Sequence, residues 1–218
     1  HMVSRGMKPE KFLCIPNGFN PEDMEVVEDI PNDFFKSVPK DKFIVGYAGS
    51  IGLANAMDYL IDAANLMLDN ANIHFVILGK GQHKEALQKK AGRNVTFLDP
   101  VKKNQVQSVL KFYDLCYIGW HDQNIYRFGI SPNKIFDYSF AGKPVLHSVR
   151  AGNDLVQEAG SGFSILPEKP ELIKESIIKA SEMEQSELIA MGQKGKDYVF
   201  AHHTYSALVD NLISAIEK

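Results

Sequence analysis

The stretch Ile125-Tyr-Arg-Phe-Gly-Ile-Ser-Pro-Asn-Lys-Ile-Phe-Asp-Tyr-Ser-Phe-Ala-Gly-Lys-Pro-Val-Leu146 joins a polar loop to a short helix and then to a strand. Ser131 is expected to cap the helix by accepting backbone N–H bonds, and Pro132 suits its first turn, where a missing N–H costs nothing. Gly142 is expected to end the helix in a left-handed conformation. The following strand is predicted over 143–147, so the stretch is typical of the mouth of a parallel sheet.

The predicted helix start is suited to phosphate, because free N–H groups and the positive helix end attract anions. Arg127 and Lys134 add positive charge beside it. Asp137 lies about one turn into the helix, where its carboxylate could accept a hydrogen bond from a ribose hydroxyl. The same three side chains could also be ordinary solvated charges, so the pattern alone leaves both interpretations open.

The rest of the chain predicts strands that alternate with helices from residue 43 to residue 166. The strands are short apolar runs, as expected when helices cover both faces of a sheet; they are predicted over 43–48, 73–78, 94–98, 115–118, 143–147 and 162–166. Helices are predicted over 54–68, 83–91, 105–112, 153–159, 170–182, 184–200 and 204–216, besides the one after Ser131. We therefore predict a doubly wound, Rossmann-like α/β fold with three layers and a mainly parallel sheet of six strands.

Two glycine turns follow predicted strands, at the edge of the sheet where ligands of such folds bind. Gly49 and Ser50 lie in the first turn, and Gly79 and Gly81 lie in the second. Their backbone N–H groups could face a phosphate, although glycines after strands often serve only as turn formers. Neither turn matches the nicotinamide fingerprint, and the chain has no Walker A loop.

The composition limits the possible functions. With 44% hydrophobic and 23% charged residues, the chain of 218 residues is typical of a globular protein. Its 24 basic and 27 acidic residues give a net charge of −3, which argues against nucleic acid as a partner. Cys14 and Cys116 lie in apolar contexts, so we expect buried free thiols and a cytoplasmic location.

A catalytic residue cannot be assigned from the sequence. His121, Asp122 and His147 lie near predicted strand ends and are candidates for acid–base chemistry, but a lone histidine is more often structural. The remaining histidines show no metal-ligand spacing, so no metal site is predicted.

Five motifs together resemble the C-terminal, donor-binding half of a GT-B glycosyltransferase of the large retaining family usually numbered four. They are Ile15-Pro-Asn-Gly-Phe-Asn20, Val45-Gly-Tyr-Ala-Gly-Ser-Ile-Gly52, Phe75-Val-Ile-Leu-Gly-Lys-Gly81, Ser131-Pro-Asn-Lys-Ile-Phe-Asp-Tyr138 and Ala141-Gly-Lys-Pro-Val145. Their order along the chain also matches that family, and the resemblance runs from about residue 15 to the end.

The resemblance implies that the chain binds a nucleotide-diphosphate sugar, with UDP as the expected nucleotide, without a metal or other cofactor. The residues expected to bind this donor are Gly49, Ser50, Gly79, Gly81, Arg127, Ser131, Pro132, Asn133, Lys134 and Asp137. An N-terminal domain, absent here, would bind the acceptor, either a glycan or a lipid-linked sugar, so this chain alone is expected to be inactive. The whole enzyme would serve bacterial surface polysaccharide assembly, in the cytoplasm or peripherally at the inner face of the plasma membrane.

Two positions depart from the family pattern. The family often has two glutamates separated by seven residues, where this sequence has Gly129 and Asp137. It also often has an arginine and a lysine after the first strand, where this sequence has Ser50 and Asn55. Both cations are missing there, so Arg127 and Lys134 become the expected partners of the diphosphate.

The resemblance also divides the chain. Residues 1–7 are expected to be a flexible cloning remnant, 8–42 an interdomain connection, 43–200 the donor-binding domain and 201–218 a helix that returns toward the N-terminal domain. Two other functions stay open. One is a UDP-sugar epimerase with the same overall fold, and the other is a non-catalytic module of the flavodoxin or receiver type.

Overall fold

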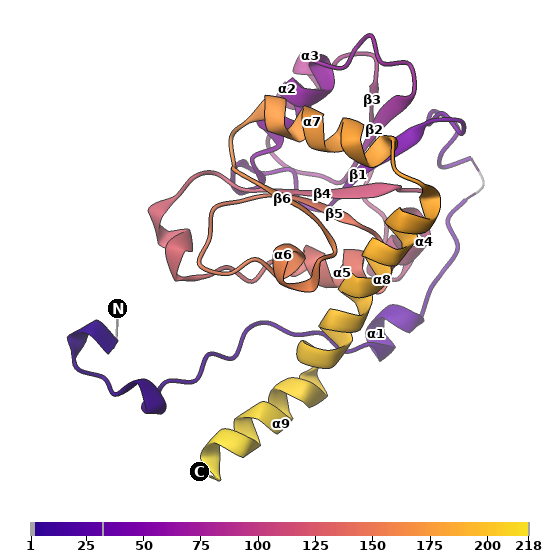
Figure 1. The fold of residues 1–218 in the computed structure, drawn as a ribbon. Helices are drawn as coiled ribbons and strands as arrows, with labels where there is room; N and C mark the ends of the chain where they lie inside the picture. Colours follow the sequence, from indigo (N-terminus) through magenta and orange to yellow (C-terminus); the bar gives the residue numbers. More distant parts are fainter. Residues whose placement is uncertain (1–2, 32, 218) are drawn as a thin grey trace.

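A computed structural model describes residues 3–31 and 33–217, so the expectation for His1 and Met2 lies outside the described residues. Its centre is a six-stranded sheet in the order β3-β2-β1-β4-β5-β6 (Figure 1). All neighbouring strands are parallel. The strands are β1 (Phe43–Ala48), β2 (Ile73–Leu78), β3 (Val95–Leu98), β4 (Leu115–Gly119), β5 (Val145–Ser148) and β6 (Gly162–Ile165).

The strand order confirms the predicted doubly wound fold. The chain moves outward from β1 to β3, returns to place β4 beside β1, and then moves outward again to β6. Such a reversal opens a crevice at the carboxyl edge of the sheet, where the loops after the two central strands diverge. The switch lies between β1 and β4, and the stretch that joins β4 to β5 contains six of the ten residues predicted to bind the donor.

One face of the sheet is covered by α2 (Met57–Asn65), α3 (Lys84–Lys90) and α7 (Pro170–Ser181), which lie above it in Figure 1. Alternate strand residues point into this layer, as the period of a strand requires. The buried strand side chains of this core include Val45, Tyr47, Phe75, Ile77, Tyr117 and Leu146. These apolar runs are buried on both faces, which is why they read as unbroken in the sequence.

The opposite face is covered by α4 (Val106–Leu110), α5 (Lys134–Phe140), α6 (Leu155–Ala159) and α8 (Gln185–His202). The intervening strand residues Ile44, Val76, Cys116 and Val145 point into this layer. Ile135, Phe136 and Tyr138 of α5 join the same core, and the hydroxyl of Tyr138 accepts a hydrogen bond from the N–H of Ala48 at 2.9 Å. The helix α5 is thereby fixed beside the end of β1.

Three local expectations were wrong. The helix predicted over 54–68 begins only at Met57, because Ala56 is left-handed (φ 46°) after the 3-10 turn Leu53–Asn55. The connection predicted as irregular over 20–41 contains the short helix α1 (Glu22–Glu25). Cys116 is buried as expected, but Cys14 is exposed, since its apolar neighbours lie on the surface as well.

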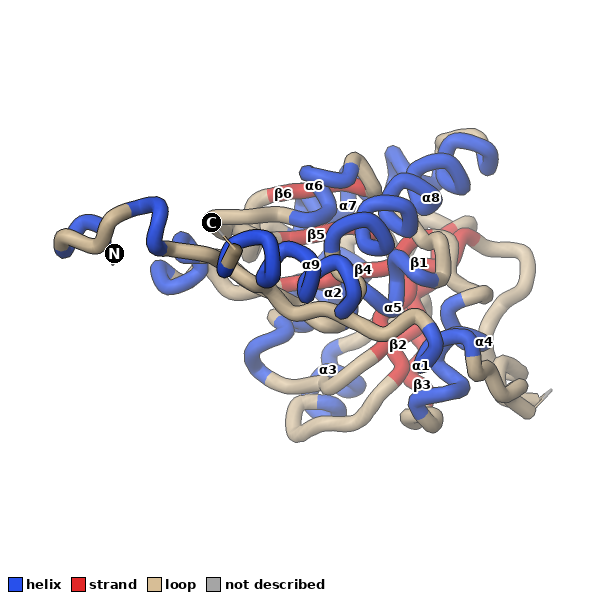
Figure 2. The backbone as a smooth tube through the Cα atoms, turned by 90° about the horizontal axis from the view of Figure 1, so that it is seen from below, coloured by secondary structure: helices blue, strands red, loops and turns tan. Residues whose placement is uncertain are grey.

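The C-terminal helix α9 (Tyr205–Ile216) projects from the body of the molecule, and the N-terminal segment runs beside it in both views (Figures 1 and 2). Much of its apolar face is exposed, including Val209, Ile213 and Ile216. Among the described residues, no helix is both long and apolar enough to cross a bilayer.

Candidate functional site

A pocket of about 360 Å³ opens where β1 and β2 end, in front of α5. Six of the residues predicted to bind a donor line it: Gly49, Ser50, Gly79, Asn133, Lys134 and Asp137. Lys80, Pro100, Val101 and Val106 add to its lining. The volume falls within the roughly 300–1,000 Å³ of small-molecule sites. The fold thus gathers residues from four separate segments at the carboxyl edge of the sheet.

The two glycine turns pack directly against each other, which explains their glycines. Gly49 and Gly79 have φ values of 150° and 151°, where other residues are strained. A Cβ on Gly79 would collide with the carbonyl oxygen of Gly49, and one on Gly81 with that of Ile51. Gly81 therefore serves the packing of the turns and does not line the pocket.

Lys134 places its ammonium group in the pocket, next to the first glycine turn. Its Nζ donates a hydrogen bond to Oδ1 of Asn55 at 2.8 Å and lies 5.3 Å from the centre of the Tyr47 ring. A Cβ on Gly49 would lie 2.4 Å from Cε of Lys134, so the missing side chain leaves room for the lysine. Burial lowers the pKa of Lys134, while the nearby Asp137 opposes that shift. The pocket therefore holds a partly desolvated cation.

Asp137 is the acidic group of the pocket. Burial raises the pKa of its carboxyl to about 6, against the opposing effects of Lys103 and Lys134. The carboxylate is half-buried and also lines a second, larger pocket of about 710 Å³ beside α9. Near neutral pH it is mostly ionised and able to accept hydrogen bonds from a ligand that carries hydroxyl groups.

The expected cap at Ser131 was wrong. The helix begins at Lys134, its N-cap Asn133 makes no side-chain cap, and the carbonyl of Pro132 accepts a bond from the N–H of Ile135 at 3.3 Å. The hydroxyl of Ser131 instead accepts a hydrogen bond from the N–H of Asn17 at 3.0 Å. Gly142 ends the helix in the left-handed conformation (φ 64°), as predicted.

Among the residues that line the pocket, Lys80 and Lys134 are the basic ones. Arg127 was expected beside Lys134, but the structure does not bring the two together at the pocket. Arg127 is exposed on a 3-10 turn (Asn124–Phe128), with its guanidinium 4.6 Å from the centre of the Phe128 ring. Ser131 and Pro132 support the turn before α5 without lining the pocket.

The candidate acid–base histidines are occupied by structural hydrogen bonds. His121 faces Glu168 Oε1 through Nδ1 and the carbonyl oxygen of Leu53 through Nε2, each at 2.9 Å. His147 is buried, accepts a bond from Nε1 of Trp120 and donates from Nδ1 to Asp154. Both rings therefore join loops at the sheet edge. Within residues 3–31 and 33–217, no three His, Cys, Asp or Glu side chains are grouped to hold a metal.

Two residues near the site were missed from the sequence. Lys103 follows β3 and lies close enough to Asp137 to lower the pKa of its carboxyl. Its position after a predicted strand was a usable signal, because parallel strands end at the same edge. Asn17 contacts Ser131 and Asn133, which are more than one hundred positions away. No local pattern could have revealed that contact.

Comparison with known proteins gives a family match and a relative. A sequence model of the family described as Glycosyl transferases group 1 matches residues 42–183. The chain is 28% identical over 123 residues to WcaI of Escherichia coli (strain K12), which is named as a colanic acid biosynthesis glycosyl transferase. That match covers 53% of this chain and 30% of WcaI.

Solved structures share the fold. The sucrose-phosphate synthase of Thermosynechococcus elongatus is 17% identical with a TM-score of 0.72, covering 93% of this chain and 51% of that chain. Anabaena HepE, solved with UDP and glucose, is 15% identical with a TM-score of 0.72, covering 99% and 59%. The C-terminal domain of LpcC, a glycosyl transferase group 1 family protein from Francisella tularensis, is 15% identical with a TM-score of 0.66, covering 86% and 100%. These overlaps confirm the predicted Rossmann-like fold, and this chain spans little more than half of the first two proteins.

Proposed function

Because the chain belongs to the family Glycosyl transferases group 1, we propose that it is the domain of a GT-B glycosyltransferase that binds the nucleotide-sugar donor. The observation that carries the proposal is the half-buried ammonium of Lys134 in a pocket at the carboxyl edge of the sheet. Sugar transfer from such a donor releases a diphosphate, whose charge must be stabilised. A cation that is already positioned and partly desolvated is suited to this task.

Lys134 also compensates for the two departures after β1. Asn55 and Ser50 stand where the family often carries cations, and Lys134 of α5 contacts Asn55. Its Nζ donates to Asn55, whose side-chain amide in turn donates to the carbonyl oxygen of Ser50 at 2.9 Å. We therefore assign the diphosphate to Lys134 and the first glycine turn, without Arg127.

Asp137 is suited to the sugar ring of the nucleotide. Its carboxylate lies one turn into α5 and lines the same pocket as Lys134. We propose that it accepts a hydrogen bond from a ribose hydroxyl. The nucleobase would then lie toward Pro100, Val101 and Val106, which supply the apolar part of the lining.

Two finer features of the proposal, the nucleotide and the biosynthetic role, are supported by the relatives. The HepE structure contains UDP, and WcaI is named for colanic acid biosynthesis, so we propose a UDP-sugar donor and a role in bacterial surface polysaccharide assembly. The acceptor would be a glycan or a lipid-linked sugar, transfer would retain the anomeric configuration, and no metal would be needed. The protein would act in the cytoplasm or at the inner face of the plasma membrane.

We further propose that this chain alone is inactive and that an N-terminal domain supplies the acceptor site. The chain spans only 51% and 59% of two structurally similar proteins. The exposed apolar face of α9 is a surface that such a domain could cover.

The proposal is tested by calorimetric titration of the chain with UDP, GDP, ADP and NAD, each with and without magnesium. We expect binding of one nucleoside diphosphate in the micromolar to millimolar range, unchanged by magnesium. The lack of binding by all four, persisting after the N-terminal domain is added, would refute a donor-binding function. If the nucleotide binds only when magnesium is present, the proposed metal independence is refuted, while the donor-binding function is not.

A further inference from the structure

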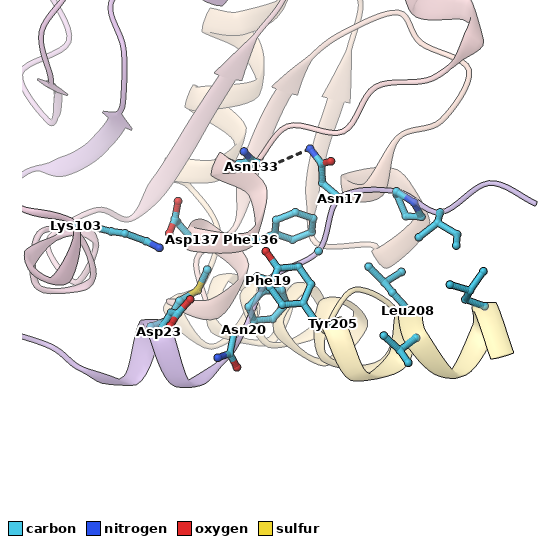
Figure 3. A pocket seen from close by; sticks show the side chains of 16 residues that line it. Asn17, Phe19, Asn20, Asp23, Lys103, Asn133, Phe136, Asp137, Tyr205 and Leu208 are labelled. Atoms are coloured by element: carbon cyan, nitrogen blue, oxygen red, sulfur yellow. Dashed lines mark hydrogen bonds between the residues drawn. The ribbon is translucent and has the colours of Figure 1, made fainter.

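Asn17 connects the N-terminal segment to the turn that opens α5 (Figure 3). Its backbone N–H donates to Oγ of Ser131, and its side-chain amide donates to the carbonyl oxygen of Ser131. The same amide donates to Oδ1 of Asn133, the bond that Figure 3 draws. Each of these three bonds is 3.0 Å long. The two ends of the turn are thereby held by one residue, and Lys134 follows directly after it.

Residues 16–19, which we call the strap, are themselves fixed on their other side. The N–H of Phe19 donates to the carbonyl oxygen of His203 and its own carbonyl accepts from the N–H of Tyr205, each at 3.0 Å. Nδ1 of His203 lies 3.3 Å from the carbonyl oxygen of Asn17, which can only accept. The backbone on both sides of Gly18 is therefore tied to the junction of α8 and α9.

Close packing leaves the strap little freedom. A Cβ on Gly18 would lie 2.5 Å from Cδ1 of Leu208 and 2.6 Å from the carbonyl oxygen of His203. The Phe19 ring is 4% exposed and stacks on Phe136 of α5, with ring centres 5.5 Å apart. Asn17 therefore projects toward α5 from a segment that is fixed by α9 on one side and by the core on the other.

We propose that Asn17 is a positioning residue for the donor, which holds the turn before α5 so that Lys134 faces the diphosphate. Asn17 does not line the donor pocket itself; it acts through Asn133 and Lys134, which do. A turn that is ordered before binding does not lose that conformational freedom when the ligand arrives. This inference rests on the proposed donor function, and it adds that the strap and the α8–α9 junction set the geometry of the donor site.

The main test compares UDP binding by the wild-type chain and by Asn17→Ala. The variant removes both side-chain bonds to the turn, so we expect UDP to bind about fivefold to tenfold more weakly. In the free protein, amide hydrogen exchange of residues 134–136 should be faster in the variant. Asn17→Asp should bind no better than Asn17→Ala, because its carboxylate would face two acceptor oxygens instead of donating to them.

Asn20→Ala is the matched control. Asn20 lies just after the strap, and its Oδ1 accepts a bond from the N–H of Glu22 at 3.3 Å instead of contacting the turn before α5. It should bind UDP like the wild type. A double-mutant cycle separates positioning from general destabilisation, since Asn17→Ala should cause little further loss in a Lys134→Met background.

The outcomes distinguish this inference from the donor function. If the wild type binds UDP and Asn17→Ala binds it within twofold of that affinity, the positioning role is refuted while the donor site stands. The positioning role would also be refuted if Asn17→Ala weakened UDP binding equally in the wild-type and the Lys134→Met backgrounds. If the wild type binds no nucleoside diphosphate even with its N-terminal domain added, both proposals are refuted.

Discussion

Lys134 Nζ donates a hydrogen bond to Oδ1 of Asn55 at 2.8 Å, across 79 positions of the sequence. The amide of Asn55 donates in turn to the carbonyl oxygen of Ser50. This chain of contacts joins the first turn of α5 to the first glycine turn. The arrangement makes the lysine the residue on which ligand binding should depend most strongly.

Lys134→Met should weaken binding of UDP by about tenfold to a hundredfold, because a charge-assisted contact contributes roughly 1.5–3 kcal/mol. Methionine keeps much of the apolar stem, so the fold should persist, which a thermal melt would show. Calorimetric titration measures the affinity. Lys89→Met is the matched control, since this exposed lysine of α3 carries the same charge on the outer surface. Equal losses in the two variants would mean that only net charge matters.

Arg127→Ala should change the affinity for UDP less than twofold. The guanidinium is exposed, lies over the Phe128 ring and does not line the pocket. The same titration tests this expectation at fixed salt concentration, because long-range attraction of the diphosphate depends on ionic strength. A loss as large as that of Lys134→Met would show that the loop over 122–131 closes onto the ligand.

Asp137→Asn should stabilise the fold in a way that depends on pH. Burial raises the pKa of Asp137 from 3.8 to about 6, so the folded protein holds this proton more tightly than the unfolded chain does. Ionisation therefore costs folding free energy that grows between pH 4 and pH 6 and is complete above that range. The variant should melt higher than the wild type at pH 7.5 and at a similar temperature near pH 4.

Thermal melts between pH 4 and pH 8 check this expectation. The exposed Asp69 provides the control, and Asp69→Asn should shift the melting temperature little at any pH. A difference between Asp137→Asn and the wild type that does not vary with pH would contradict the raised pKa.

Gly46→Ala should destabilise the central strand. A Cβ at Gly46 would overlap the ring of Tyr113, which is completely buried. Overpacking of this kind costs about 1–3 kcal/mol. Urea unfolding measures the loss, and Gly52→Ala is the control because no atom lies within 4 Å of its added Cβ. Equal stability of the two variants would show that Tyr113 can move aside.

Most of the fold was predictable from the short hydrophobic runs that form the strands and from their order along the chain. The bounds of β1 and β2 agree with the prediction at both ends, because these central strands are buried on both faces and their apolar runs stop where the chain leaves the core. The edge strand β6 was predicted one residue too long, since its side chains are only partly buried and its limits depend on local contacts. Gly142 was also predicted correctly as the residue that ends α5, because the left-handed backbone at the end of a helix depends on the local sequence.

The candidate site was predictable only in part. Strand ends and glycine turns are local signals, and they led to Gly49, Ser50, Gly79, Asn133, Lys134 and Asp137, which line one pocket. Ser131 was predicted to cap the helix, but its hydroxyl accepts a hydrogen bond from the N–H of Asn17, which lies 114 positions away. Arg127 was predicted to lie beside Lys134 at the diphosphate, but its side chain is exposed to solvent.

The sequence by itself determined most of the secondary structure, the parallel sheet and the edge at which a ligand would lie. These depend on hydrophobic periodicity and turn chemistry, which act over a few neighbouring residues. The tertiary structure alone decided which cation enters the pocket, how the carboxyl pKa of Asp137 is raised and which residue holds the turn before α5. Those features depend on burial and on contacts between distant segments, and both exist only once the chain has folded.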